Sequence, residues 1–270
     1  MSETDKIFAG AIPALYDRYL RPMIFEPYAV DLAARFRDLD KGRLVETAAG
    51  TGAVTEALGR TISERVAITA TDLNPPMLDY AATRSRSQRK IVWQQADASA
   101  LPFKDGEFDA LVCQFGVMFF PDKTAAFREA ARVLKPGARF VFNVWDRIEH
   151  NEFAHVVAGA VAAAFPENPP MFLARTAHSY YDIAVIRDGL RSAGFTQIEI
   201  ETVQRTSRAP SHRDPAIGFC QGSPLRNEIE ARNASRLEEI TEAVADAVRE
   251  CFGEGPINGK IRAHVITAIR

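Results

Sequence analysis

Residues 44–55 contain the chemically most informative pattern of the sequence. An apolar segment ends at Glu46, and Gly50 and Gly52 follow one residue apart before helix-forming sequence. Glycine has no Cβ, so it can adopt positive φ and let a ligand approach the backbone closely. In α/β sheets, such a strand–loop–helix unit binds nucleotide-like ligands at the carboxyl edge of the strands. Because Glu46 would repel a pyrophosphate but suits a ribose or an α-amino group, the loop predicts a site for an adenosyl group without phosphates.

Three further loops follow strand-like segments and carry polar side chains. Asp72 ends the segment 66–71, and its carboxylate can accept hydrogen bonds from both hydroxyls of a ribose. Asp97 follows the segment 91–95 and could accept from an exocyclic amine, and Gln114 begins the fourth loop. Taken alone, either aspartate is explained equally well as a helix cap or a turn former. Since loops after parallel strands share one edge of the sheet, the four loops together predict one ligand site.

Apolar patterns predict alternating strands and helices through the first two hundred residues. The predicted strands are 44–48, 66–71, 91–95, 108–114, 138–145, 197–205 and 260–269, and the predicted helices are 11–20, 26–38, 53–60, 75–86, 123–134, 151–164 and 182–193. The first two helices are joined through Arg21-Pro22, and the residues 134–137 predict a helix stop and a turn. This alternation implies a mostly parallel sheet with helices on both faces.

The organisation changes after residue 208. Residues 209–259 are polar and rich in proline and glycine, with one predicted helix near 226–251. A structureless loop of that length is improbable in a compact domain, so we expect a helical insertion that could act as a lid. The apolar tail 260–269 is then the partner strand of 197–205.

Composition excludes several classes of protein. The chain has 270 residues, and its net charge of −2 provides no basic field for a nucleic acid. No apolar run is long enough to span a bilayer and the first residues lack a signal-peptide core, so we expect no membrane insertion and a cytoplasmic location. The three cysteines are widely spaced without a CxxC pair, which indicates a reduced setting and no structural zinc.

The ordered loops resemble those of the class I S-adenosylmethionine-dependent methyltransferases, in the branch of the ubiquinone/menaquinone biosynthesis methyltransferases. The first motif of that family is an acid followed by three alternating glycines, and it matches Glu46, Gly50 and Gly52, with Ala48 at the position of the first glycine. Asp72 matches the ribose-binding acid of the family. Asp97 and Ala98 resemble the pair of residues on the adenine side of the family's site, and the residues up to 109 resemble the run before its fourth strand. Residues 133–138 resemble the family's turn into the fifth strand.

The resemblance implies a doubly wound α/β fold. Its sheet should have seven strands in the order 3-2-1-4-5-7-6, with the last strand antiparallel. Residues 1–40 would form an N-terminal helical cap, 41–208 and 260–270 the α/β domain, and 209–259 the insertion. We expect the cap to bring Tyr16 and Tyr19 to the methionine end of the cofactor.

The resemblance also implies the activity, which is transfer of a methyl group from S-adenosyl-L-methionine to a small organic acceptor, with S-adenosyl-L-homocysteine as product. The residues expected to contact the cofactor are Tyr16, Tyr19, Glu46, Ala48, Gly50, Thr51, Gly52, Asp72, Leu73, Met77, Asp97, Ala98, Gln114 and Phe115. The five histidines include candidate bases such as His178, but the sequence identifies no catalytic residue. We expect no metal, and a monomer or a homodimer.

Two other functions remain open at this point. A dinucleotide oxidoreductase would also place an acid near the end of the second strand. However, its G-x-G-x-x-G fingerprint is absent because Gly52 is followed by Ala53, Val54 and Thr55. A non-catalytic adenosyl-binding module would keep the fold without turnover, because a fold does not establish a reaction.

Overall fold

The computed structural model describes residues 5, 7–85 and 89–270. These residues form two compact units, and each unit is assembled from separated stretches of the chain. Unit 1 comprises Met1–Pro27, Trp145–Ser179 and Gln204–Arg262, and unit 2 comprises Tyr28–Val144, Tyr180–Val203 and Ala263–Arg270. Unit 2 therefore contains the four loops of the predicted ligand site, and unit 1 contains both ends of the predicted insertion.

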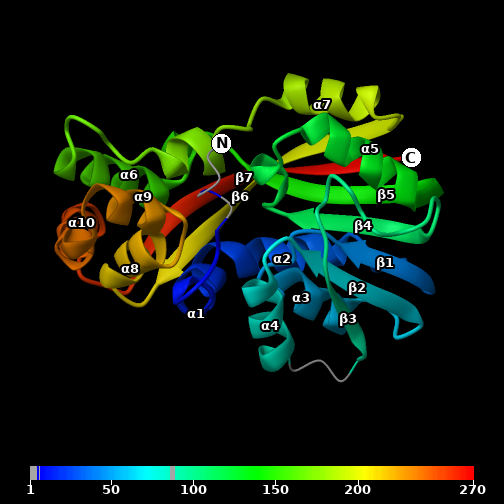
Figure 1. Ribbon diagram of the computed structural model, residues 1–270, viewed down its shortest axis with the longest axis horizontal. Coiled ribbons are helices and arrows are strands. Elements are labelled where there is room, and N and C mark those ends of the chain that lie inside the picture. Colours follow the sequence, from blue (N-terminus) through cyan, green and yellow to red (C-terminus); the bar gives the residue numbers. More distant parts are fainter. Residues whose placement is uncertain (1–4, 6, 86–88) are drawn as a thin grey trace. The chain divides into compact units, whose positions relative to one another are not determined.

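Seven strands form one sheet in the order β3-β2-β1-β4-β5-β7-β6 (Figure 1). Their bounds are β1 Gly42–Glu46, β2 Val66–Asp72, β3 Ile91–Gln95, β4 Phe108–Gln114, β5 Leu134–Trp145, β6 Gln197–Ala209 and β7 Ile257–Ile269. The strands from β1 to β5 pair in parallel, and β7 is antiparallel. The predicted fold class and strand order are confirmed.

Helices cover both faces of the sheet in unit 2. They are α2 (Glu26–Ala34), α3 (Ala53–Thr61), α4 (Pro75–Arg84), α5 (Lys123–Val133) and α7 (Ile183–Ser192). Val141 of β5 belongs to the core cluster that contains α2 and α3, whereas its neighbours Phe140 and Phe142 contact the ring of Phe127 in α5. Successive residues of β5 thus face opposite layers, as the period of a strand requires.

The start of β5 differs from the prediction. Helix α5 ends at Val133, close to the predicted stop, but the strand begins at once at Leu134 instead of at 138. Phe108 of β4 pairs with Leu134, and Ala110 pairs with Arg139, so the register shifts between these two pairs. The residues predicted as a turn are therefore an irregularity inside the strand. Gly137 has a φ of +79° there, which only glycine adopts without strain.

Unit 1 is largely helical. Its helices are α1 (Ile12–Leu15), the π-helix η2 (Tyr16–Phe25), α6 (Glu152–Ala164), the short π-helix η5 (Leu173–Ala177), α8 (Arg213–Gln221), α9 (Leu225–Asn233) and α10 (Leu237–Phe252). The prediction of one helix near 226–251 is wrong, because α9 and α10 share this region and the short 3₁₀ helix η6 (Ala234–Arg236) lies between them. Pro224 precedes α9, and the Asn233 side chain accepts a hydrogen bond from the N–H of Ser235, which separates α9 from α10.

The break predicted at Arg21-Pro22 does not occur. The chain continues through Pro22 as a π-helix of ten residues. Proline has no N–H to donate to the carbonyl four residues earlier and clashes with it, and the wider turn of a π-helix accommodates the ring. Inside η2, the guanidinium of Arg21 donates to the carboxylate of Asp17 over 3.1 Å, with both side chains buried.

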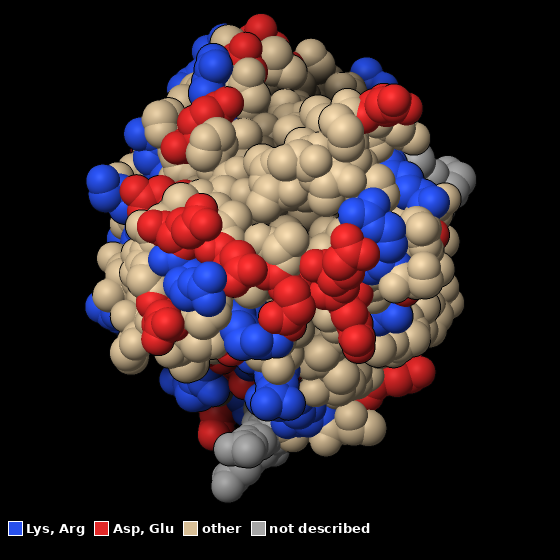
Figure 2. All heavy atoms as spheres, turned by 90° about the vertical axis from the view of Figure 1, so that its left-hand side faces the viewer, with Lys and Arg blue, Asp and Glu red and all other residues tan. Residues whose placement is uncertain are grey.

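The face of the molecule on the α6–α10 side of Figure 1 carries charges of both signs, with Asp and Glu gathered in a band beside Lys and Arg (Figure 2). Arg236 pairs with Glu239, and Arg249 pairs with Asp246, both within one turn of helix. Such exposed pairs contribute little to stability, roughly 0–1 kcal/mol each. In the described part of the chain, no helix has the length and apolarity needed to cross a membrane.

Candidate functional site

The loop between β1 and α3 contains three left-handed residues at alternate positions. The φ angle is +53° at Ala48, +56° at Gly50 and +81° at Gly52. A Cβ on Gly52 would approach the Trp93 ring to 3.0 Å, so the close packing adds to the preference for glycine that the positive φ already sets. The loop therefore has the conformation that the two glycines predicted, and Ala48 adopts the same conformation despite its side chain.

Backbone hydrogen bonds fix this loop to the neighbouring strands. The N–H of Thr47 donates to the carbonyl of Val112 in β4 over 3.0 Å, and the N–H of Ala49 donates to that of Thr71 in β2 over 2.9 Å. Because both ends of this short segment are bonded to strands, the loop is a rigid part of the sheet edge.

Glu46 lies beneath the loop and is only 1 % exposed. Its Oε2 accepts a hydrogen bond of 2.5 Å from the hydroxyl of Thr55 in α3, and its backbone carbonyl accepts one of 2.9 Å from the hydroxyl of Thr71. The carboxylate thus connects β1 to the helix that follows the loop. The sequence predicted Glu46 as a site residue but not Thr55. The two are nine positions apart, a distance that covers only the loop and the first turn of α3, and this spacing is the signal that could have revealed Thr55.

Asp72 is the best-defined polar group of the site. Its Oδ2 accepts from the N–H of Gly50 over 2.8 Å, and its Oδ1 accepts from the N–H of Asn74 over 2.8 Å. Burial is the largest influence on this carboxyl and raises its pKa, although these hydrogen bonds oppose the shift. Asp72 therefore joins the first two loops. Oδ1 also accepts from the side-chain amide of Asn74 over 3.3 Å. Oδ2 has a second lone pair beyond its backbone bond, which leaves capacity for a ligand hydroxyl.

The second and third loops are also connected. The N–H of Ala96 donates to the carbonyl of Asp72 over 3.0 Å. Asp97 is exposed, and its Oδ1 accepts from the N–H of Ser99 over 2.8 Å, so its carboxylate shapes its own turn. Leu73 is 43 % exposed and Met77 is buried in α4. Ala98 lies in the turn that the hydrogen bond from Ser99 to Asp97 stabilises. This turn follows β3, so it lies at the same edge of the sheet as the first two loops.

The fourth loop leaves two buried polar atoms without partners. Gln114 ends β4 in register with Asn143 of β5. The N–H of Phe115, at a φ of +48°, donates to Asn143 Oδ1 over 2.8 Å. Within residues 5, 7–85 and 89–270, neither Gln114 Oε1 nor Asn143 Nδ2 has a hydrogen-bond partner. Buried unsatisfied polar groups are costly, so these two atoms mark a place where a ligand could bind.

Asn143 was not predicted as a site residue. It is fully buried in the run Phe140–Trp145, whose other side chains are apolar. A lone amide in such a strand is the signal that could have revealed it, since buried polar side chains need a partner. Its Oδ1 fixes the positive φ of Phe115 through the hydrogen bond to the backbone.

Tyr16 and Tyr19 belong to η2 in unit 1, whereas the four loops belong to unit 2. The Tyr16 ring stacks on Phe25 with centroids 4.7 Å apart, and the Arg18 guanidinium lies over the Tyr19 ring. The contact of these tyrosines with a cofactor stays a prediction.

Ala48 provides a test of how the loop is built. A non-glycine residue in the left-handed region is strained by about 1–2 kcal/mol, partly offset by the extra flexibility that glycine brings to the unfolded chain. We expect Ala48→Gly to raise the free energy of unfolding by about 0.5–1 kcal/mol in urea titrations. The matched change Gly50→Ala, at nearly the same φ, should lower it. A destabilised Ala48→Gly variant would show that the methyl group stabilises the loop.

Known proteins are similar in sequence to the part of the chain that contains the four loops. Residues 45–142, which contain all four loops, match the methyltransferase domain family. The ubiquinone/menaquinone biosynthesis C-methyltransferase UbiE of Shewanella woodyi is 27 % identical over 169 residues, which cover 58 % of this chain and 67 % of that protein.

Solved structures show the same fold. The phosphoethanolamine N-methyltransferase 2 of Haemonchus contortus, in complex with S-adenosyl-L-methionine, superposes with a TM-score of 0.60 at 14 % identity, over 96 % of this chain and 56 % of that chain. The YcgJ protein of Bacillus subtilis superposes with a TM-score of 0.56 at 18 % identity, over 90 % of this chain and 98 % of that chain.

Proposed function

Because this chain is a class I S-adenosylmethionine-dependent methyltransferase, we propose that unit 2 binds the cofactor at the four loops and that the methyl group goes to a small organic acceptor. The observation that carries the proposal is the pair of short hydrogen bonds by which Asp72 joins the glycine loop to the second loop. They place a buried carboxylate beside a backbone that a ligand can approach closely.

The chain's own residues fit an adenosyl ligand. Asp72 would accept hydrogen bonds from the ribose hydroxyls, and Gly50 and Gly52 would let the ligand lie against the backbone. Gln114 Oε1 and Asn143 Nδ2 are buried polar atoms that a ligand could satisfy. We infer that Glu46, Ala48, Thr51, Leu73, Met77, Asp97, Ala98 and Phe115 complete the site, together with Tyr16 and Tyr19 of unit 1.

When bound, the cofactor supplies a methyl group on a positively charged sulfur, which is already a strong electrophile. The protein then has mainly to hold the acceptor close and aligned, since orientation alone contributes several kcal/mol, about 7–11 in the most favourable intramolecular cases. The first loop of unit 2 suits this role because its backbone is hydrogen-bonded to β2 and β4. We assign acceptor binding to unit 1, with residues 209–259 as its lid.

The remaining properties follow from charge and composition. A net charge of −2 and the mixed signs on the face in Figure 2 favour a small molecule over a nucleic acid as acceptor. We infer a cytoplasmic enzyme, as a monomer or a homodimer.

Calorimetric titration with S-adenosylhomocysteine tests the cofactor half of the proposal. We expect saturable binding to one site per chain. The acceptor half is tested with methyl-labelled S-adenosylmethionine and a panel of small hydroxy, amino and activated-carbon compounds. Binding without transfer to any of them would favour a non-catalytic adenosyl-binding module, and no binding at millimolar ligand would overturn the proposal.

A further inference from the structure

His178 of unit 1 is a buried titratable group that the cofactor site does not use. It follows η5 directly, and it is 5 % exposed. Its Nδ1 lies 2.9 Å from the backbone carbonyl of Asp146. Because a carbonyl can only accept, Nδ1 carries the proton, and the lone pair of the neutral ring is on Nε2. Among the described residues, none is hydrogen-bonded to Nε2.

The surroundings of His178 keep the ring neutral. Burial is the largest influence and lowers the pKa of the imidazole to about 4, although the Asp146 carbonyl and the negative charges of Glu149 and Asp146 act in the opposite direction. The Asp146 carboxylate is itself paired with Arg262, through a hydrogen bond of 2.5 Å. A general base works best with a pKa near the working pH. His178 is therefore better suited to accept a hydrogen bond than to remove a proton.

Aromatic rings of unit 1 lie in a row beside this imidazole. The ring of His178 is 5.9 Å from that of Trp145, and Trp145 is 6.2 Å from Phe25. Tyr16 stacks on Phe25 at 4.7 Å. His178 and Tyr16, which carries a hydroxyl, are thus the two ends of a row whose middle is formed by Trp145 and Phe25. Apolar linings with a few polar groups are typical of small-molecule sites.

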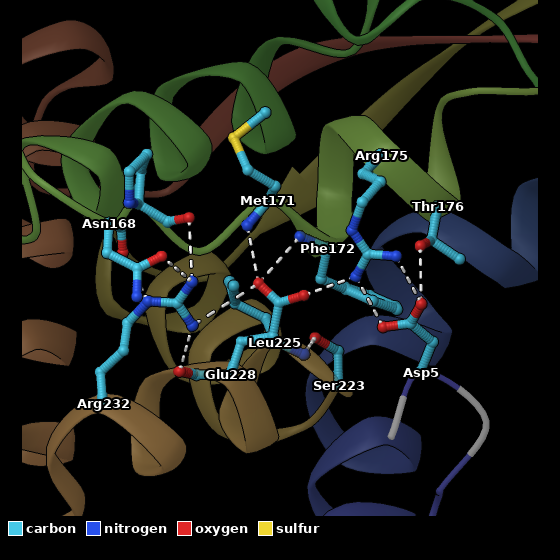
Figure 3. A network of polar contacts seen from close by, with 11 residues as sticks. Asp5, Asn168, Met171, Phe172, Arg175, Thr176, Ser223, Leu225, Glu228 and Arg232 are labelled. Atoms are coloured by element: carbon cyan, nitrogen blue, oxygen red, sulfur yellow. Dashed lines mark hydrogen bonds and ion pairs between the residues drawn. The ribbon is translucent and has the colours of Figure 1, made fainter. Parts of the chain in front are cut away.

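A carboxylate from α9 fixes the backbone that leads to His178 (Figure 3). Glu228 Oε2 accepts from the N–H of Met171 over 2.7 Å and from that of Phe172 over 3.3 Å. Glu228 Oε1 accepts from the guanidinium of Arg175 over 2.6 Å. Glu228 therefore holds both the start of η5 and a side chain in its middle.

A second carboxylate, from the N-terminal segment, fixes the same helix (Figure 3). Asp5 is 1 % exposed, and its two oxygens accept from the two terminal nitrogens of Arg175 over 2.7 and 2.8 Å. The hydroxyl of Thr176 donates to Asp5 Oδ2 over 3.1 Å. Charged hydrogen bonds of this two-pronged kind are strong and directional. The last turn before His178 is therefore held from two sides, which is how a binding group is preorganised.

We propose that His178 orients the methyl acceptor by accepting, at Nε2, a hydrogen bond from an O–H or N–H group of that molecule. This inference rests on the proposed function, because it assigns the acceptor to unit 1. His178 then determines specificity, since a molecule without such a donor would leave Nε2 buried and unpaired, which binding sites reject strongly.

Phenol and anisole, which share a ring and differ in the O–H group, are the probes for this inference. In ¹⁵N-histidine NMR spectra of the wild-type protein with S-adenosylhomocysteine present, phenol should shift the Nε2 resonance of His178 in a saturable manner, and anisole should not. The resonance is assigned as the one of five histidines that is missing in His178→Phe. Equal shifts with both probes, or none with phenol, would overturn the inference.

Two variants give an independent readout. We expect His178→Phe to weaken phenol binding about fivefold, the size of one hydrogen bond, and His178→Gln to restore part of the affinity because its amide oxygen can accept. Affinity for S-adenosylhomocysteine should stay unchanged in both, since its proposed site is in unit 2. If wild type, His178→Phe and His178→Gln bound the cofactor normally and bound phenol with equal affinity, the inference about His178 would be contradicted. The proposed function would not be affected by that result. Loss of cofactor binding in the wild type would instead contradict the proposed function.

Discussion

Replacing Asp72 by alanine is expected to weaken the binding of S-adenosylhomocysteine by more than tenfold. The substitution removes a charged acceptor for the ribose hydroxyls, which costs about 1.5–3 kcal/mol. It also leaves the N–H groups of Gly50 and Asn74 without their acceptor, so the first two loops lose the side chain that joins them. Calorimetry on wild type and variant gives the ratio of dissociation constants.

Asp109→Ala is the matched control for this experiment. Asp109 is a carboxylate of unit 2 near the start of β4, where its Oδ2 accepts from the N–H of Arg43 over 2.9 Å and its Oδ1 accepts from Lys135 over 2.7 Å. Its loss removes hydrogen bonds of a carboxylate at the opposite edge of the parallel sheet, away from the four loops, so the cofactor affinity should stay nearly unchanged. Equal affinity of Asp72→Ala and wild type would show that the ribose is bound elsewhere.

Acid is expected to destabilise unit 1 through His178. The folded-state pKa of about 4 lies below the ordinary value of 6.5. Between pH 6.5 and pH 4 the imidazole binds a proton in the unfolded chain but not in the folded chain. The contribution of His178 to the free energy of unfolding is therefore fully present above pH 6.5 and is lost as the pH falls toward 4. Between about pH 7.5 and about pH 5 the loss should be about 2 kcal/mol, and about 3 kcal/mol once both states are protonated.

The comparison with His178→Gln isolates this effect. Asp72, whose raised pKa acts in the opposite direction, is present in both proteins and cancels. Trp93→Phe makes Trp145 the only tryptophan, and its ring lies 5.9 Å from His178, so its fluorescence reports unfolding of unit 1. Wild type should lose about 2 kcal/mol more than the variant over this pH range. Equal losses would mean that the imidazole of the folded protein titrates normally.

The sheet and its loops could be predicted because their signals are local. One apolar run is followed within a few positions by Gly50 and Gly52, and another is followed directly by Asp72. In each case a few neighbouring residues predict the strand, the place where it ends and the residues of the loop after it. The resemblance added the strand order, which comes from the family pattern. The hydrogen bond from Gly50 to Asp72 follows once β1 and β2 are neighbours in the sheet.

Unit 1 could not be predicted because its contacts join distant parts of the chain. Asp5 and Arg175 are 170 positions apart, and no periodic pattern links them. Proline normally ends a helix, but here Pro22 lies inside a π-helix, in which the neighbouring Met23 carbonyl accepts a hydrogen bond from the distant Ser207 hydroxyl. The sequence pattern predicts one helix over α9 and α10, because their polar surfaces have similar composition and only the short segment that Asn233 caps divides them.

The amide resonances of the loops provide the most direct test of the cofactor site. In a ¹H–¹⁵N NMR titration with S-adenosylhomocysteine, we expect the N–H signals of Gly50, Gly52 and Asn74 to shift together and to saturate at one ligand per chain. These groups lie on or beside the backbone that Asp72 holds in place. Saturable binding that leaves all three signals unchanged would contradict a cofactor site at these loops.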